Sequence, residues 1–229
     1  MEIQLDDISI VAEYRRVRNM RLTVYRSGKV MLVLPYLTPM HEAMRFVEQK
    51  ADWIRKHHKN RFQPSKKEPF HYTDGERHLL FGDSLILQVK QISSGHQTVI
   101  KQEDRLVMLC KYDTDESHRE ALLYSFYRRE LNRYLEQRLA YYTLLYKEEN
   151  VSFHIRRMKT EWGSCIARKR SLLFNLDLAL APPHLIDYVI VHELCHLQVQ
   201  NHGPKFKTLL GSRMADWQKR KQALNEYAG

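Results

Sequence analysis

Two histidines that stand four residues apart, His192 and His196, flank a glutamate at position 193. On a helix, residues four apart lie on one face, so both imidazoles could bind the same metal ion. The Glu193 carboxylate would project to the side, where it can reach water on the metal rather than the metal itself. This spacing is typical of zinc sites that activate water for hydrolysis.

A third candidate ligand, His202, follows six residues after His196. On a continuing helix it would lie about 240° around the axis from His196 and point elsewhere. Asn201 and Gly203 tolerate the left-handed conformation that ends helices, and Pro204 cannot continue the helical hydrogen bonds. We therefore predict that the helix stops before His202 and that the chain turns back toward the metal.

Three histidine ligands leave one zinc position open, which is typical of catalytic rather than structural sites. Zinc can lower the pKa of bound water toward about 7, and Glu193 would act as the general base that takes the proton. The pattern thus predicts a zinc-dependent hydrolase. The same ligands also suit Mn²⁺, Co²⁺ or Ni²⁺, so the identity of the metal stays open. Cys195 lies about 100° from His196 on the helix and should face the core.

The elements around these residues follow from apolar periodicity. Pro182 and Pro183 suit the first turn of a helix that runs through both histidines, and the residues from Tyr188 to Val191 are apolar and uncharged, as in a buried helix. Strands are expected near 153–158 and 172–178, and a further helix after Pro204. A long helix is expected from Ser117 to about Lys147, with the apolar stripe Leu122, Phe126, Leu131, Leu135, Leu139 and Tyr142.

The N-terminal half predicts a β-rich part with one helix. Residues 8–35 alternate like a hairpin with a turn at 27–29, and a helix opens at Thr38-Pro39. Residues 63–69 are the best linker candidate. Short strands are expected at 78–81, 85–91, 98–101 and 106–109. No internal repeat is visible. We predict an α+β protein with a β-rich part over 1–112 and a metal-binding part over 113–229, together forming one compact unit.

Composition limits the classes of function. The 229 residues include 37 Lys and Arg against 27 Asp and Glu, so the net charge of +10 permits weak binding of polyanions or only a solubilising surface. No apolar run approaches the roughly 20 residues that cross a bilayer, and the first residues lack the features of a signal peptide. The three cysteines form no C-x-x-C pair. These features favour a cytoplasmic protein without a membrane partner.

The metal-site residues and their surroundings resemble the YgjP-like metallopeptidase family, which is related to the SprT-like and WLM zinc peptidases. Its motifs are matched at His192, Glu193, His196 and His202, with Phe206 four positions after the last. Further matches are Trp162, Gly163, Ser164, Cys165, Asn175 and Ala181-Pro182. The motifs cover residues 160–206.

This resemblance implies a zincin-like core, in which the active-site helix packs on a small sheet. It implies His192, His196 and His202 as zinc ligands of a peptidase. Residues 162–165 would form a tight turn beside the site. Gly163 would allow close approach of a substrate backbone, whereas Cys165 could contact the ligands, be redox-sensitive or simply pack in the turn.

Three hypotheses of function follow from the sequence. The first is a metallopeptidase that acts on peptides or proteins. The second is a metal-dependent nucleotide pyrophosphatase, an activity assigned to members of the family, with phosphates bound by Arg156, Arg157, Lys159, Arg168, Lys169 and Arg170. The third is a nucleic-acid-associated protein in which zinc is structural and residues 55–67 contact phosphates.

Overall fold

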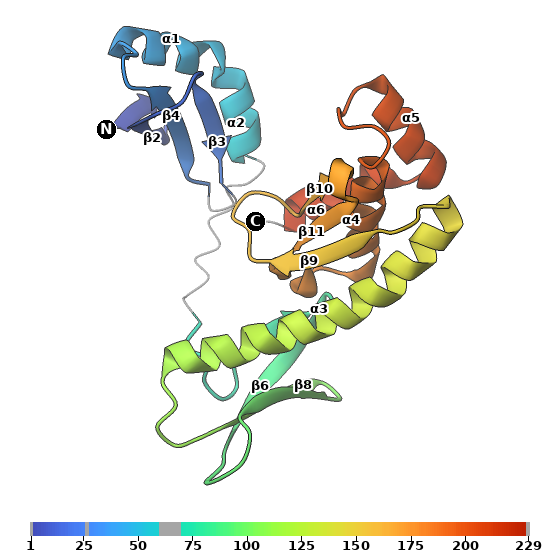
Figure 1. Ribbon diagram of the computed structural model, residues 1–229. Coiled ribbons are helices and arrows are strands. Elements are labelled where there is room, and N and C mark those ends of the chain that lie inside the picture. Colours follow the sequence, from blue (N-terminus) through green and yellow to red (C-terminus); the bar gives the residue numbers. More distant parts are fainter. Residues whose placement is uncertain (1, 26–27, 60–69, 228–229) are drawn as a thin grey trace. The chain divides into compact units, whose positions relative to one another are not determined.

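The computed structural model describes residues 2–25, 28–59 and 70–227 (Figure 1). The linker predicted at 63–69 and part of the turn predicted at 27–29 lie outside these residues. The chain divides into two compact units, one of residues 67–222 and one of residues 1–66 with 223–229. The boundaries between the units thus fall after residue 66 and after residue 222, whereas the change of structure predicted after residue 112 falls inside the larger unit.

The smaller unit contains a four-stranded sheet and a helical pair. Its strands are β1 (Glu2–Leu5), β2 (Ile8–Arg15), β3 (Arg21–Val24) and β4 (Val30–Pro35), in the order β1-β2-β4-β3. The alternating residues Ile8, Ile10, Leu32 and Leu34 are buried against Val47 and Ile54 of the helices. The single helix predicted after Pro39 is two helices, α1 (Met40–Gln49) and α2 (Ala51–Lys59), because Lys50 leaves helical geometry with ψ near 6°.

The larger unit begins with a second four-stranded sheet. Its strands are β5 (Arg77–Leu80), β6 (Asp83–Gln91), β7 (Thr98–Gln102) and β8 (Arg105–Cys110), in the order β5-β6-β8-β7. All four strands were predicted within two residues of their bounds. The turn at Phe81-Gly82 has both residues in the left-handed region, and its amide groups donate hydrogen bonds to the Ala179 and Leu180 carbonyls. This turn therefore docks the sheet onto the part of the unit that follows.

The two sheets share one topology, which the sequence did not reveal. In each sheet the first two strands pair antiparallel, the second and fourth pair parallel, and the third and fourth pair antiparallel. In each case a helix follows the fourth strand. A strand requires only that buried and exposed positions alternate, and many different residues satisfy this pattern. The same topology can therefore occur twice without a visible sequence repeat.

Helix α3 (Glu116–Tyr146) is 31 residues long and runs through the larger unit. The Asp115 carboxylate accepts a hydrogen bond from the His118 amide at 2.8 Å and caps the first turn. Its buried stripe contains Leu123, Phe126, Tyr127, Leu131, Leu135, Leu139 and Tyr142. Five of the six predicted residues are among them, whereas Leu122 is only partly buried. The helix contacts β7 and β8, and it also contacts the 3₁₀ helix η2 (Leu176–Leu180) and the helix α4 (Pro183–Cys195). Figure 1 shows its course through the unit.

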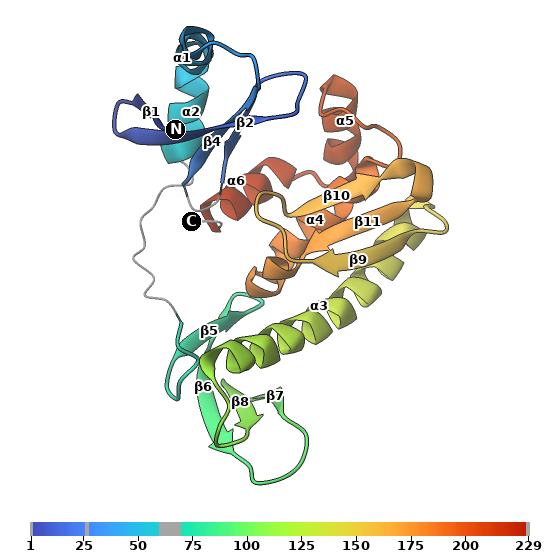
Figure 2. The same cartoon turned by 60° about the vertical axis from the view of Figure 1, so that its left-hand side comes forward.

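A three-stranded sheet lies beside the second half of α3 (Figure 2). It consists of β9 (Ser152–Arg156), β10 (Gly163–Ile166) and β11 (Ser171–Asn175), in the order β10-β11-β9, with the short helix η1 (Ala167–Lys169) between β10 and β11. The predicted strand over 172–178 is too long, because the Asn175 side chain accepts a hydrogen bond from the Asp177 amide and begins the 3₁₀ helix η2 (Leu176–Leu180).

Three helices complete the chain, where the sequence predicted two. They are α4 (Pro183–Cys195), α5 (Pro204–Arg213) and α6 (Trp217–Tyr227). Helix α4 contacts β10, α3 and α5, and ten of its thirteen residues are buried. The helices and the mixed sheets confirm the predicted α+β class. Among the described residues, no helix combines the length and the apolar character that a membrane span needs.

Candidate metal site

Three imidazole nitrogens meet where α4 ends. His192 lies in the last turn of α4, His196 caps that helix, and His202 lies in the connection to α5. The Nε2 atoms of His192 and His196 are 3.2 Å apart, and the Nε2 atom of His202 lies 3.0 Å from the first and 3.1 Å from the second. The structure thus brings together the three residues that the spacing of His192 and His196 and the predicted helix break before His202 indicated.

The outer nitrogens of two of these rings have partners that direct Nε2 inward. His196 Nδ1 lies 3.0 Å from the Val199 carbonyl oxygen, which can only accept, so Nδ1 carries the hydrogen and Nε2 presents a lone pair. His192 Nδ1 lies 3.4 Å from the Tyr188 hydroxyl, one helical turn earlier. Such outer contacts fix the ring orientation that a metal ligand needs.

Phe206 of α5 forms one wall of the cluster. Its ring centroid lies 4.9, 4.5 and 4.8 Å from those of His192, His196 and His202, and its side chain is almost fully buried. Burial, together with the neighbouring imidazoles and Lys221, lowers the pKa of His192 to about 3. The ring is therefore neutral near pH 7, as a ligand must be.

The arrangement fits a tetrahedral metal ion. Ligand nitrogens at about 2.0–2.1 Å from zinc are about 3.3 Å apart in a tetrahedron, close to the 3.0–3.2 Å between these Nε2 atoms. A cation among the three Nε2 atoms could accept a lone pair from each imidazole. Among the described residues, no other group of His, Cys, Asp and Glu has such ligand geometry.

The Glu193 side chain lies between α4 and β10. Only 5% of its surface is exposed, and no described residue donates a hydrogen bond to its carboxylate. A Cβ atom on Gly163 of β10 would stand 2.8 Å from Glu193 Oε1 and 2.9 Å from its Cγ. The absence of a side chain at Gly163 therefore makes room for the carboxylate of Glu193.

Burial, with a smaller contribution from the Glu161 carboxylate, raises the pKa of Glu193 to about 8 in the metal-free protein. A cation among the three imidazoles would act in the opposite direction on the neighbouring carboxylate. A group whose proton is bound weakly enough to release near neutral pH suits proton transfer.

Residues 162–165 do not form the predicted tight turn, because Gly163–Ile166 is strand β10. Ser164 and Cys165 pair with Leu173 and Leu172 of β11. Cys165 is half-buried, and burial, then the Glu193 carboxylate, raises its pKa to about 11. A thiol with a raised pKa is a poor nucleophile, so a redox role has no support from its surroundings.

Asn175 holds the loop that leads into β10. Its side chain is fully buried and donates hydrogen bonds to the Met158 and Glu161 carbonyls, both at 2.9 Å. Its oxygen accepts from the Met158 and Asp177 amides, both at 3.2 Å. Its backbone amide donates to the Trp162 carbonyl at 2.9 Å. Asn175 therefore holds the segment from Met158 to Trp162, which leads into β10, and its hydrogen bonds do not involve the three histidines.

The break before His202 has a different mechanism from the predicted one. Neither Asn201 nor Gly203 has a positive φ, and Gly203 has φ near −71° and ψ near −170°. Instead, α4 tightens after Cys195, whose carbonyl accepts from the amides of both Gln198 and Val199. Pro204 then begins α5, where its missing amide hydrogen costs nothing.

Reasoning from sequence missed two of the residues that surround the cluster. Tyr188 precedes His192 by four residues, a spacing that could have identified it as a neighbour on the same helical face. No local signal identifies the Val199 carbonyl, because a backbone oxygen has no sequence signature. Cys195 is fully buried, as expected.

Comparison with known proteins assigns the chain to a family. A search of curated proteins found no match. The family model described as "YgjP-like, metallopeptidase domain" matches residues 18–227, nearly the whole chain. With the three-histidine cluster, this match identifies the chain as a member of the YgjP-like metallopeptidase domain family.

Proposed function

We propose that this chain is a zinc-dependent metallopeptidase with a zincin-like core. His192, His196 and His202 would hold the metal, and Glu193 would be the general base. The observation that carries the proposal is the convergence of three Nε2 atoms within 3.0–3.2 Å at the end of α4, next to a buried carboxylate. The same geometry can accept Mn²⁺, Co²⁺ or Ni²⁺.

The metal, when bound, supplies a Lewis acid that acidifies water and polarises a carbonyl oxygen. Glu193 accepts the proton of the attacking water and later donates it to the leaving amine. Gly163 keeps the Glu193 carboxylate at the side of the cluster, since any larger residue would meet it. Phe206 closes one side of the cluster to water.

The edge strand β10 supports an extended peptide as the substrate. Just before β10, the Asn175 amide donates a hydrogen bond to the Trp162 carbonyl, and Gly163 and Cys165 lie opposite Phe174 and Leu172 of β11. Because antiparallel pairs alternate, the polar backbone groups of Gly163 and Cys165 face away from β11. A peptide that added a strand at this edge would pair with the strand that contains Gly163, whose missing Cβ faces Glu193.

The other two hypotheses have less support. Two of the six basic residues considered for nucleotide phosphates have carboxylate partners, since Arg157 pairs with Glu120 and Arg170 with Glu148. The basic segment considered for nucleic acid, residues 55–67, extends beyond the described residues. A metal bound by three histidines alone also leaves a position open, which purely structural zinc sites do not.

The test compares the zinc-loaded chain with its Glu193→Gln variant on unfolded proteins and peptides of mixed sequence. Glutamine has the same shape beside Gly163 but is no base, so the variant should bind zinc one to one and lose at least about 10²-fold in cleavage rate. Glu161→Gln is the matched control, because Glu161 is an exposed carboxylate near the same site. Equal cleavage by the wild type and Glu193→Gln would contradict the proposal, and release of phosphate from nucleoside triphosphates instead would favour the nucleotide hypothesis.

A further inference from the structure

The Glu148 carboxylate joins four separate segments of the larger unit. It follows α3 and is 8% exposed. Its Oε1 accepts hydrogen bonds from Gln198 Nε2 at 2.7 Å and from the Arg213 guanidinium at 3.1 Å, and its Oε2 accepts from Arg170 at 2.8 Å. Arg170 also donates to the Glu149 carbonyl at 2.6 Å.

Two of these partners bracket the third candidate ligand. Gln198 precedes His202 by four residues, and Arg213 is the last residue of α5, the helix that starts two residues after His202. One oxygen atom therefore holds both ends of the segment on which His202 lies. The residue after Gln198 is Val199, whose carbonyl oxygen is the partner of His196 Nδ1.

The third partner connects Glu148 to the strand beside Glu193. Arg170 ends the connection between β10 and β11 in a left-handed conformation with φ near 46°. β10 contains Gly163, which lies against Glu193. The Glu148 carboxylate thus contacts the segment that contains Val199 and His202, and it also contacts the connection that follows β10, the strand of Gly163.

The ion pair of Glu148 with Arg213 is buried, and Arg213 is anchored by a second residue. The Arg213 side chain is only 8% exposed, its guanidinium lies over the Tyr146 ring at 4.5 Å, and the Tyr146 hydroxyl donates to the Arg213 carbonyl at 2.9 Å. Removing one partner of such a pair leaves an uncompensated buried charge, so the segments cannot separate without cost.

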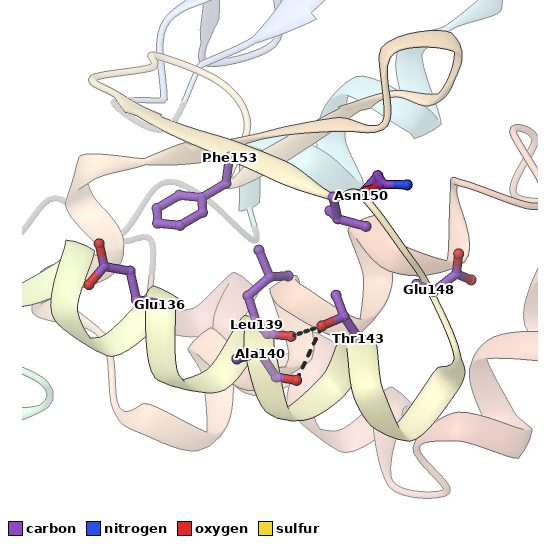
Figure 3. A pocket seen from close by; sticks show the side chains of 8 residues that line it. Glu136, Leu139, Ala140, Thr143, Glu148, Asn150 and Phe153 are labelled. Atoms are coloured by element: carbon purple, nitrogen blue, oxygen red, sulfur yellow. Dashed lines mark hydrogen bonds between the residues drawn. The ribbon is translucent and has the colours of Figure 1, made fainter.

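An open pocket of about 350 Å³ borders Glu148 between α3 and β9. Figure 3 shows Leu139 and Phe153 in its middle, with the Glu148 carboxylate at its edge, well away from the Phe153 ring. The carboxylate is therefore used for the arginines and Gln198 rather than for the pocket.

We propose that Glu148 is a positioning residue of the metal site, which holds the segment from Gln198 to His202 in place so that the third imidazole faces the other two. It acts through Gln198 and Arg213 and does not touch the metal. This inference rests on the proposed metal site, but its test needs no peptide substrate.

The experiment compares Glu148→Gln and Gln198→Leu with the wild type. Zinc affinity is measured by competition with a chromophoric chelator, and the coordination of added Co²⁺ by its visible absorption, which is intense only for four-coordinate geometry. Amide hydrogen exchange of residues 198–203 is followed in the metal-free protein. Asp187→Asn is the matched control, because Asp187 of α4 is an equally buried carboxylate whose side-chain partners are Arg138, at 2.6 Å, and Tyr134, both on α3.

Both test variants should lose about 10- to 100-fold in zinc affinity, weaken the Co²⁺ absorption and exchange faster at residues 198–203. Asp187→Asn should lower thermal stability yet keep the wild-type affinity. Gln198→Leu leaves the ion pairs intact, so it separates positioning from general loss of folding. Wild-type affinity and exchange in both test variants, or an equal loss in Asp187→Asn, would overturn the inference. A wild type that binds zinc but cleaves no peptide would refute the proposed peptidase alone, whereas a wild type that binds no metal would refute both.

Discussion

Gly163 and Glu193 are in contact across thirty positions of sequence, in an arrangement that leaves no room for a methyl group. A Cβ atom at position 163 would lie 2.8 Å from Oε1, 2.9 Å from Cγ and 3.0 Å from Cδ of Glu193. Since the glutamate is nearly fully buried, its side chain cannot simply turn into solvent. The position of the proposed general base is therefore defined by a missing side chain on the neighbouring strand.

The substitution Gly163→Ala should displace the Glu193 carboxylate while leaving the three imidazoles in place. A misplacement near 1 Å can cost about 10²-fold in rate, so peptide cleavage should fall by that order with zinc content unchanged. Gly211→Ala is the control, because its added Cβ would meet only Trp217 at 3.6 Å, an ordinary contact. Cleavage at the wild-type rate by Gly163→Ala would show that the close contact does not position the base.

The substitution His202→Ala should reduce zinc affinity by more than about 100-fold. Substitutions of residues that only contact the ligands typically cost about 10–100-fold. Its Nε2 lies 3.0 and 3.1 Å from those of the other two histidines, so two ligands would remain. Zinc content after dialysis against a weak chelator is the measurement. His184→Ala, which removes an exposed imidazole at the start of α4, should bind zinc like the wild type. Retention of one zinc per chain by His202→Ala would exclude His202 as a ligand.

The substitution Asn175→Leu should destabilise the protein by about 2–4 kcal/mol, because several buried backbone groups lose their partners together. The Asn175 side chain satisfies the Met158 amide and the carbonyls of Met158 and Glu161. Urea unfolding of the metal-free protein measures the change. Asn132→Leu on α3, where the partly buried amide donates a hydrogen bond to the Glu136 side chain rather than to backbone groups, should cost far less. A similar small loss in both variants would argue against this role of Asn175.

Glu148 should contribute to the free energy of unfolding at neutral pH and lose this contribution in acid. Burial alone would raise the pKa of Glu148, but hydrogen bonds from Arg170, Gln198 and Arg213 lower it below its ordinary value of 4.5. Between the folded and unfolded pKa values the unfolded chain binds more protons, so the contribution of this group is full above about pH 5.5 and falls as the pH drops through 4.5 and lower.

The measurement is the difference in free energy of unfolding between the wild type and Glu148→Gln, taken from urea titrations at several pH values. This difference should stay constant from about pH 7 to 5.5 and shrink toward pH 3.5. Other carboxylates titrate in both proteins and cancel. A difference that grows as the pH falls would mean that the folded protein raises the pKa of Glu148.

Local patterns in the sequence predicted those features that depend on local geometry. The four-residue spacing of His192 and His196 and the stop signal at Pro204 suffice to predict that three imidazoles come together, and apolar alternation predicts the strands from β5 to β8. The prediction that left-handed residues at 201 and 203 end the helix is wrong. The helix ends instead in a tightened last turn, in which all φ values are ordinary.

Features that depend on distant pairing could not be predicted in the same way. The parallel pairs β2 with β4 and β6 with β8 and the contact of Gly163 with Glu193 join residues with no shared pattern. The strand predicted through Leu178 ends at Asn175 because its side chain caps a 3₁₀ turn, and an asparagine in an apolar run gives no indication of which backbone groups it will bind. The Glu148 contacts likewise join four segments that periodicity treats separately.

The length of α3 has a consequence for how the larger unit unfolds. At 1.5 Å per residue its 31 residues span about 47 Å, with β7 and β8 against one part and η2 and α4 against another. If the elements packed against one part of α3 unfold, the apolar side chains of that part become exposed to water. The helix must nevertheless stay folded there, because its other part is still packed. The β5–β8 sheet and the metal-binding region should therefore melt in a single cooperative transition, and a chain shortened to the metal-binding region alone should not hold a native core.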